Sequence, residues 1–290
     1  MDQIVAEAAI FRAVRPEVIS ALTDDLRTVD TAPGDVFFTE GDVGGRMYIV
    51  LSGKVKIGCR APDGRQKLFA VLGPSETFGE VSTLDPGWRN YTATALTHVR
   101  ALVVPRDVLL AWVAQRPEIA QQMMLVLARR LRGADDDHSD LMFTDVAGRL
   151  AKQLLRLAQQ FGVPHKGVLR VAHELTQGEL SQLVGASRET VNKALSDFSN
   201  YGWIRLQSKT VLIVDYECLA SRAREPASDH AGRTNAAGVD EAKRMIMERF
   251  GITATQANTL LTKLSQDSNT PVTDIAANIV ISGSVLSIVG

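Results

Sequence analysis

The stretch from residue 176 to residue 198 decides the fold of the region around it: Thr176-Gln-Gly-Glu-Leu-Ser-Gln-Leu-Val-Gly-Ala-Ser-Arg-Glu-Thr-Val-Asn-Lys-Ala-Leu-Ser-Asp-Phe198. It opens with a capping box, because the hydroxyl of Thr176 and the carboxylate of Glu179 can each satisfy a free backbone N–H at a helix start. Gly185 then breaks this helix, and Ser187 caps a second one. Apolar residues of both helices supply a shared core: Leu180, Leu183, Val184, Val191, Leu195 and Phe198. The pattern predicts two helices joined by a short turn.

The residues on either side of this helix pair complete a larger unit. A hairpin is predicted from Trp203-Ile-Arg-Leu to Val211-Leu-Ile-Val, joined across Gln207-Ser-Lys209. A short strand, Val168-Leu-Arg-Val-Ala, precedes the first helix. Two helices followed by a β-hairpin are the outline of a winged helix–turn–helix, so we expect this unit to bind DNA.

Polar residues near the start of the second helix suit the reading of a major groove. An arginine fork such as that of Arg188 can bind guanine bidentately, and a carboxylate such as Glu189 can accept from the cytosine amine. Lys152, Arg205 and Lys209 could hold phosphates. The residues that we expect to bind DNA are Thr176, Gln177, Ser187, Arg188, Glu189, Asn192, Lys193 and Lys209. The alternative is a plain helical hairpin with solvated charges.

Upstream, between Pro33 and Pro105, short β-branched runs alternate with glycines. The runs Met47-Tyr-Ile-Val-Leu, Lys54-Val-Lys-Ile-Gly and Arg100-Ala-Leu-Val-Val predict strands. Regularly spaced short strands imply a closed antiparallel roll or barrel, because a parallel sheet would need helices that the gaps cannot hold. Together with the helical segments elsewhere, this gives an α+β fold.

Two neighbouring segments of the predicted roll, Phe78-Gly-Glu-Val-Ser82 and Pro86-Gly-Trp-Arg-Asn90, carry the chemistry of an anion site. Gly79 permits close backbone approach, and a short helix after it would offer N–H groups to an anion. Arg89 can neutralise a phosphate bidentately, and Glu80 can accept from a ribose hydroxyl. The candidate binding residues are Gly79, Glu80, Val81, Ser82, Arg89, Asn90 and, farther along the chain, Asp135. The alternative is a loop in which Glu80 and Arg89 form a salt bridge.

A long helix is predicted after the roll, and its apolar residues fall in two adjacent stripes. One stripe is a heptad seam of Ala120, Met124, Leu127, Leu131, Ala134, His138 and Leu141, and the other comprises Ile119, Met123 and Val126. Two stripes favour a helix that covers the roll with one face and pairs with a second copy of the chain through the other. The alternative is a helix packed only on its own domain.

The last part of the chain begins with a change of composition. Residues 221–238 are small, polar and without pattern, which predicts a linker. Three helical patterns follow, and their apolar residues could form one small core: Ala242, Ile246, Ala257, Leu260, Leu261, Leu264, Ile275, Ala276 and Ile279. Four cations of this segment, Lys243, Arg244, Arg249 and Lys263, could contact the phosphates of an RNA hairpin.

Composition limits the remaining classes of function. The 290 residues carry a net charge of −1, so any nucleic-acid site must be a local patch. The two cysteines, Cys59 and Cys218, lie far apart and do not suit a disulfide scaffold, a zinc finger or a redox centre. The five histidines lack metal-ligand spacing, and no hydrolase triad or Walker loop is present. We therefore expect neither an enzyme nor a metal or redox cofactor. A polar start without a long apolar run predicts a cytoplasmic protein with no membrane segment.

The segments Leu183-Val-Gly-Ala-Ser-Arg-Glu-Thr-Val-Asn-Lys-Ala-Leu and Phe143-Thr-Asp-Val-Ala-Gly-Arg-Leu-Ala-Lys-Gln-Leu-Leu resemble the cyclic-AMP receptor protein (CRP/FNR) family, in its actinobacterial form. The resemblance covers the chain from the first helix to about residue 224. It implies a homodimer that binds double-stranded DNA and RNA polymerase, with cyclic AMP as effector and with Arg188, Glu189 and Lys193 reading bases.

Two departures from the family pattern concern the effector. Asn90 stands where members that bind cyclic AMP usually carry Ser or Thr. The long helix offers Ala134 and Asp135 where the family has polar groups for adenine, so we expect weak or altered binding of cyclic AMP.

Residues 239–280 are similar to an ANTAR domain, a three-helix RNA-binding module of antitermination. Arg244 replaces a usual glycine, and Leu264 replaces a usual aromatic residue or histidine. We expect domains at 1–115 (roll), 116–142 (dimerisation helix), 143–224 (winged helix–turn–helix), 225–238 (linker) and 239–290 (ANTAR-like). Three alternatives stay open: a DNA binder independent of nucleotide, an antiterminator acting on RNA with a secondary DNA module, and a C-terminal module that contacts only protein partners.

Overall fold

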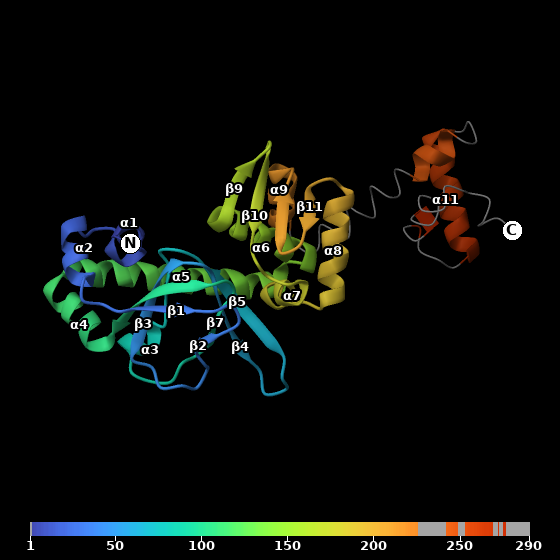
Figure 1. Ribbon diagram of the computed structural model, residues 1–290. Helices are drawn as coiled ribbons and strands as arrows, with labels where there is room; N and C mark the ends of the chain where they lie inside the picture. Colours follow the sequence, from blue (N-terminus) through green and yellow to red (C-terminus); the bar gives the residue numbers. More distant parts are fainter. Residues whose placement is uncertain (1, 226–241, 249–252, 269–271, 273–274, 277–290) are drawn as a thin grey trace. The chain divides into compact units, whose positions relative to one another are not determined.

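The computed structural model describes residues 2–225, 242–248, 253–268, 272 and 275–276 (Figure 1). The chain divides into two compact units, Met1–Arg224 and Glu225–Gly290. No helix among the described residues is long and apolar enough to cross a lipid bilayer.

The first unit begins with short helices that pack against later ones. They are α1 (Asp2–Ala6), the 3-10 helix η1 (Ala9–Phe11) and α2 (Pro16–Thr23). Phe11 is fully buried and its ring lies 5.5 Å from that of Trp112. These helices therefore complete an apolar core with the long helix rather than standing apart.

The predicted roll consists of two four-stranded antiparallel sheets. One has the strand order β1-β8-β3-β6 and the other β2-β7-β4-β5. The strands are β1 (Thr28–Thr31), β2 (Val36–Phe38), β3 (Arg46–Ser52), β4 (Val55–Arg60), β5 (Gln66–Leu72), β6 (Thr77–Phe78), β7 (Thr92–Ala95) and β8 (Val99–Pro105). An apolar core that draws on both sheets confirms the antiparallel β architecture expected from the glycine-punctuated sequence.

Helix α3 (Val81–Leu84) interrupts the roll, and α4 (Arg106–Gln115) and α5 (Pro117–Phe143) follow it. The stripe of Ile119, Met123 and Val126 packs into a core that the strands of the roll share with the N-terminal helices, so this face of the helix covers the roll as predicted. The heptad seam instead leaves Met124 and Leu131 more than 60% exposed. The two stripes of α5 therefore have different surroundings.

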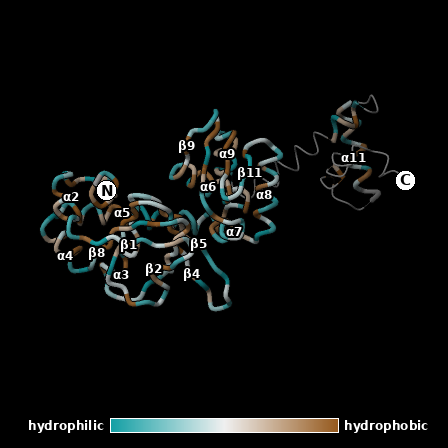
Figure 2. Tube along the Cα trace, viewed as in Figure 1, coloured by the Kyte–Doolittle hydropathy of each residue, from teal (hydrophilic) through white to brown (hydrophobic). Residues whose placement is uncertain are grey.

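The last part of the first unit is the predicted winged helix–turn–helix. Its elements are α6 (Val146–Phe161), β9 (Gly162–His165), β10 (Val168–Ala172), α7 (Gln177–Val184), α8 (Arg188–Asn200), β11 (Ile204–Gln207), β12 (Thr210–Ile213) and α9 (Tyr216–Arg224). The sheet has the order β11-β12-β10-β9, so β9, which the sequence analysis missed, adds an edge strand. Hydropathy varies along α6 and α8 (Figure 2), and their apolar residues, such as Leu154 and Leu195, are buried.

The second unit is described only in part. Helix α11 (Ala254–Ser268) begins at a capping box, in which the Thr253 N–H donates to Gln256 Oε1 at 2.9 Å. A small core joins three segments: Ala242, Ile246, Ala257, Leu261, Ile275 and Ala276. The shared core expected from the helical patterns is therefore present, except for Ile279, which lies outside the described residues.

Candidate functional site

The predicted anion segment starts at a backbone position that only glycine suits. Gly79 has a φ of +82°, and a Cβ there would lie 2.7 Å from Arg89 Nη1 and 2.9 Å from the carbonyl oxygen of Arg46. Its N–H donates to the hydroxyl of Tyr91 at 2.7 Å. Burial raises the pKa of Tyr91 to about 12, so this hydroxyl stays neutral near neutral pH. The turn thus places Gly79 within contact distance of Arg46, Arg89 and Tyr91.

Arg89 lies inside this turn and is only 5% exposed. Its Nη1 donates to the carbonyl of Gly79 and to Ser82 Oγ, both at 2.8 Å, and its Nη2 donates to the carbonyl of Arg46 at 2.7 Å. The guanidinium also lies 4.0 Å from the ring centroid of Phe38. Burial lowers the pKa of Arg89 because desolvation disfavours the charged form. The guanidinium is therefore held rigidly in place.

Glu80, which is 3% exposed, forms its ion pair with Arg130 of α5. Arg130 also donates to the carbonyl of Thr77. The alternative of a salt bridge between Glu80 and Arg89 is wrong, because Arg89 donates to backbone carbonyls and to Ser82 instead. The long helix thus contributes directly to the site, a role for Arg130 that the sequence analysis missed.

The helical spacing of residues in α5 indicates that Arg130 faces the core of its own unit. Ile119, Met123 and Val126 pack toward the unit's own core. Residue 130 continues that stripe at the next helical step. A cation at the end of an inward-facing stripe indicates a buried acidic partner, although the stripe does not identify which one.

Two polar atoms of this cluster have no partner within the described part of the chain. They are Glu80 Oε2 and Arg89 Nε, and both are buried. A buried polar atom without a hydrogen bond costs roughly 1–3 kcal/mol. One unpaired acceptor and one unpaired cationic donor fit a ligand that carries both a hydroxyl and an anion, such as a cyclic nucleotide.

The structure unites some of the predicted binding residues and not others. Gly79, Glu80, Ser82 and Arg89 form the cluster. Val81 is 41% exposed, and Asn90 is also exposed. Asp135 lies on the exposed surface of α5, where its side chain can be reached by solvent. Helix α3 starts directly after Glu80, as expected.

The charged side chains of the predicted DNA-reading surface are mostly exposed, unlike the buried charges of the roll. The hydroxyl of Ser187 caps α8 by accepting from the Thr190 N–H at 3.1 Å. Arg188, Glu189 and Lys193 are exposed, whereas Asn192 is half-buried. The three exposed charges therefore share the first two turns of one helix and are open to a partner.

The first helix of the pair also starts as the sequence predicted. The Thr176 N–H donates to Glu179 Oε2 at 2.8 Å, and the Glu179 N–H donates back to Thr176 Oγ1 at 3.2 Å. Thr176 and Gln177 are exposed at this helix start. Lys209 is exposed in the hairpin turn with a φ of 54°. Gly185 ends α7 in the left-handed conformation, with a φ of 71°.

One predicted phosphate contact needs correction. Lys152 forms an ion pair with Asp140 of α5, because α6 folds back beside the end of that helix. Likewise, Asp137 pairs with Arg156 of α6. The charges in this part of α5 are thus partly neutralised within the chain, and Lys152 does not stand on an open surface.

The RNA candidates lie in the second unit. Lys243 is half-buried, and Arg244 and Lys263 are exposed. Arg249 lies outside the described residues. Groups of three or more potential metal ligands do not occur among the residues that the structure describes.

Comparison with known families assigns each region. Residues 28–116 match the cyclic nucleotide-binding domain, residues 148–222 the Crp-like helix-turn-helix domain, and residues 233–280 the ANTAR domain. These matches define a DNA-binding transcriptional regulator with a nucleotide-binding domain and an added ANTAR domain.

Full-length relatives identify the family. The chain is 58% identical, over 224 residues, to the CRP-like cAMP-activated global transcriptional regulator of Mycobacterium tuberculosis, covering 77% of this chain and all of the relative. It is 34% identical to the cyclic AMP receptor protein of Thermus thermophilus, covering 70% of this chain and 90% of that protein. The chain therefore belongs to the CRP/FNR family, whose members are transcriptional regulators and not enzymes.

Solved structures agree with the fold. A CRP/FNR-family transcriptional regulator from Thermus thermophilus has a TM-score of 0.58 at 27% identity, covering 69% of this chain and 99% of that chain. FixK2 from Bradyrhizobium japonicum has a TM-score of 0.62 at 20% identity, covering 70% and 99%. The α+β arrangement of roll, long helix and helix–turn–helix is thus that of the family.

Proposed function

We propose that this chain is a homodimeric transcriptional regulator whose DNA binding is modulated by cyclic AMP. The observation that carries this proposal is the pair of buried, unpartnered atoms Glu80 Oε2 and Arg89 Nε in the roll. The ribose end of the nucleotide would satisfy Glu80, and the phosphate would engage Arg89 with Ser82 beside it. The M. tuberculosis relative, named cAMP-activated, supports the same ligand class.

The long helix is the proposed route from nucleotide to DNA. Arg130 ties Glu80 to α5, and the exposed residues Met124 and Leu131 lie on the seam of the same helix. A second copy would bury this seam, since exposed large apolar residues at heptad spacing are typical of a dimer interface. A nucleotide that moves Arg130 would then change the pairing of the two α5 helices and the aim of the two α8 helices.

The adenine end of the nucleotide is proposed to bind differently from that of relatives. Ala134 has no hydrogen-bonding side chain, and an ionised Asp135 can accept from an adenine amine but cannot donate. We expect an altered response to cyclic AMP as a result.

The regulator would act on cytoplasmic DNA together with RNA polymerase.

The ANTAR domain supports a second activity, the binding of an RNA hairpin in antitermination. The exposed cations Arg244 and Lys263 and the half-buried Lys243 would contact its phosphates, together with Arg249. Selection of RNA by the full chain tests this part. The proposal would be supported if hairpins are enriched and the Lys263→Ala variant of the protein binds them more weakly. A selected pool without enriched hairpins would count against it.

The central experiment measures DNA affinity of the full chain with and without cyclic AMP. The DNA is a duplex selected from a random pool by the protein, and cyclic GMP is the comparison ligand. We expect cyclic AMP to tighten binding, and footprints to show two half-sites about one helical turn apart. Equal affinity with every nucleotide would favour the nucleotide-independent binder, and a footprint without twofold symmetry would reject the dimer.

A matched pair of variants tests whether Arg130 couples nucleotide binding to DNA binding. In Arg130→Gln the ion pair with Glu80 is lost, so we expect the effect of cyclic AMP on DNA affinity to shrink several-fold. Arg132→Gln removes the same charge from an exposed position of the same helix and should leave the effect intact. An equal response in the two variants would contradict the role given to Arg130.

A further inference from the structure

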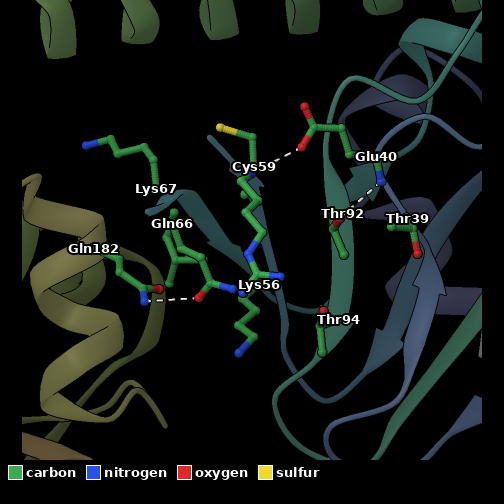
Figure 3. Close-up of a pocket in the computed structure, with 12 residues that line it drawn as sticks. Thr39, Glu40, Lys56, Cys59, Gln66, Lys67, Thr92, Thr94 and Gln182 are labelled. Atoms are coloured by element: carbon green, nitrogen blue, oxygen red, sulfur yellow. Dashed lines mark hydrogen bonds between the residues drawn. The ribbon is translucent and has the colours of Figure 1, made fainter. Parts of the chain in front are cut away.

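The β4–β5 ribbon of the roll lies directly against the helix–turn–helix. Lys56 of β4 forms an ion pair with Glu179 of α7 at 2.5 Å. Lys67 Nζ donates to the carbonyl of Leu183 at 3.2 Å. Figure 3 shows Gln182 of α7 reaching toward the ribbon, where its Nε2 donates to Gln66 Oε1 at 3.2 Å. Three polar contacts therefore fix the ribbon beside α7.

Beyond these contacts, the tip of the ribbon faces the turn between α7 and α8 across a cleft of about 630 Å³. The ribbon wall includes Arg60, Arg65 and Lys67, and the opposite wall includes Gly185, Ala186 and Ser187. Among the residues that line this cleft there is no aspartate or glutamate. The cleft therefore pairs a cationic wall with the capped start of the predicted recognition helix.

The two arginines at the tip are available to a partner. Arg60 is exposed, and among the described residues its hydrogen bond to a side chain is made by the backbone N–H, which donates to Glu40 Oε2 at 3.1 Å and leaves the guanidinium available. Arg65 pairs with Asp63 at 2.7 Å, but 85% of its side chain is exposed, so water screens this pair. Lys67 differs, because its ammonium is already used to hold α7. Arg60 and Arg65 are thus the groups that could bind an anion.

We infer that the ribbon tip is a second DNA-binding element, in which Arg60 and Arg65 contact the phosphate backbone beside the groove that α8 enters. Ser187, on the opposite wall of the cleft, immediately precedes Arg188, the first proposed base-reading residue. Phosphates on the rim of a major groove run past the start of a helix inserted in it. The inference rests on the proposed DNA binding by α8.

DNA fits this surface better than a protein partner does. The arginines are solvent-exposed and cationic, the cleft is open, and the neighbouring surface already belongs to the proposed DNA interface. Phosphate contacts add affinity without sequence preference, and each contact that is removed flattens the dependence of log affinity on log salt concentration. The roll would then contribute to DNA affinity directly as well as through nucleotide binding.

The test is the salt dependence of DNA binding by the full chain at saturating cyclic AMP. The probes are the selected duplex and a mixed-sequence duplex of the same length. In Arg60→Ala/Arg65→Ala we expect the salt slope to fall by about 0.9 for each lost phosphate contact. Affinity for both duplexes should fall by a similar factor, because phosphate contacts carry no base information.

Controls separate this inference from the function on which it rests. Arg60→Lys/Arg65→Lys keeps the charge and should retain most of the slope, and Arg100→Ala removes an exposed charge from β8 and should leave it unchanged. An alanine double variant with the wild-type slope would overturn the inference. If that variant also lost transcription activation in a reconstituted reaction, the tip would be a protein contact instead. If the wild-type chain bound neither duplex, the proposed function itself would fail.

Discussion

The proposed nucleotide pocket and the proposed DNA-reading helix both depend on charged side chains, but those side chains are buried in the pocket and exposed on the helix. In the roll, Glu80 and Arg89 are almost fully buried and held by neighbouring groups. On α8, Arg188 and Lys193 are exposed and the helix itself is fixed by a serine cap. The comparison shows that one site is preorganised through its side chains and the other through its backbone.

Because the charges are buried in one region and exposed in the other, mutations in the two regions should affect stability and binding differently. A change in the pocket should alter both stability and ligand response, because the same hydrogen bonds serve both. A change on the face of α8 should alter binding with little effect on folding, because exposed charges contribute little to stability. Substitutions in the two regions can therefore test the comparison directly.

The largest effect is expected from Arg89→Ala. It removes three hydrogen bonds that a charged donor makes, so the carbonyl of Arg46 and the hydroxyl of Ser82 lose this donor, whereas the carbonyl of Gly79 keeps the hydroxyl of Thr83 at 2.7 Å. Hydrogen bonds made by a charged group contribute roughly 1.5–3 kcal/mol each, so we expect the free energy of unfolding to fall by about 4 kcal/mol or more. Urea denaturation measures this loss, and calorimetry should show the loss of cyclic AMP binding.

Arg100→Ala is the matched control for that substitution, because Arg100 is exposed on β8 of the same domain. We expect its unfolding free energy to change by less than about 0.5 kcal/mol. If the two variants were equally stable, Arg89 would not be held as the structure indicates, and the contrast between the two regions would lose its basis.

The features that the sequence predicted well are those made by neighbouring residues. The capping box of Thr176 and Glu179, the cap at Ser187 and the glycine turn at Gly185 each arise within a few residues, and all three are present. Local hydrogen bonding at helix ends depends on residue type and spacing alone, so it can be inferred without the tertiary structure.

The missed features join residues far apart in the chain. Arg130 and Glu80 are 50 positions apart, and Lys56 and Glu179 are 123 apart. Strand spacing predicted an antiparallel roll, but it did not indicate that β1, β8, β3 and β6 would be neighbours. Pairings of this kind depend on how whole elements pack. The wrong prediction for Lys152 has the same origin, because its partner Asp140 lies on a different helix.

A buried group in the DNA-binding domain extends the comparison to pH. His173 is 5% exposed, and its Nδ1 accepts from the Leu175 N–H at 3.0 Å. Burial, with a smaller effect of Lys54, lowers the pKa of His173 to about 4. Between pH 6.5 and 4 the unfolded chain therefore binds a proton that the folded chain does not. Stability should fall as pH falls through this window, by about 3 kcal/mol.

Thermal and urea unfolding from about pH 7.5 to about pH 4 measure this dependence. His173→Asn keeps a side-chain acceptor but does not titrate, so we expect a flatter profile in that window. His98→Asn changes an exposed histidine and should follow the wild type. A wild-type slope in His173→Asn would show that the imidazole is not held neutral by burial.

A smaller effect, confined to binding, is expected from Arg188→Ala. Loss of one bidentate base contact costs about 2 kcal/mol, or roughly 30-fold in affinity for the selected duplex. Affinity for a mixed-sequence duplex should change much less, and the unfolding midpoint should stay within error. Arg12→Ala, at an exposed site in the N-terminal segment, is the control. Equal losses on both duplexes would make Arg188 a phosphate contact rather than a base-reading residue.

The smallest effect is expected from Ser187→Ala, which tests whether the backbone of α8 is as important as its charges. The substitution leaves the Thr190 N–H without its side-chain acceptor, and removal of a helix cap costs about 1 kcal/mol of stability. Because Arg188 lies in the first turn, fraying there should also weaken binding of the selected duplex by several-fold. Ser208→Ala, in the exposed hairpin turn, should do neither. If Ser187→Ala lost stability but kept full affinity, DNA would reorder the helix start on binding, and backbone preorganisation would not distinguish the DNA-reading surface from the pocket.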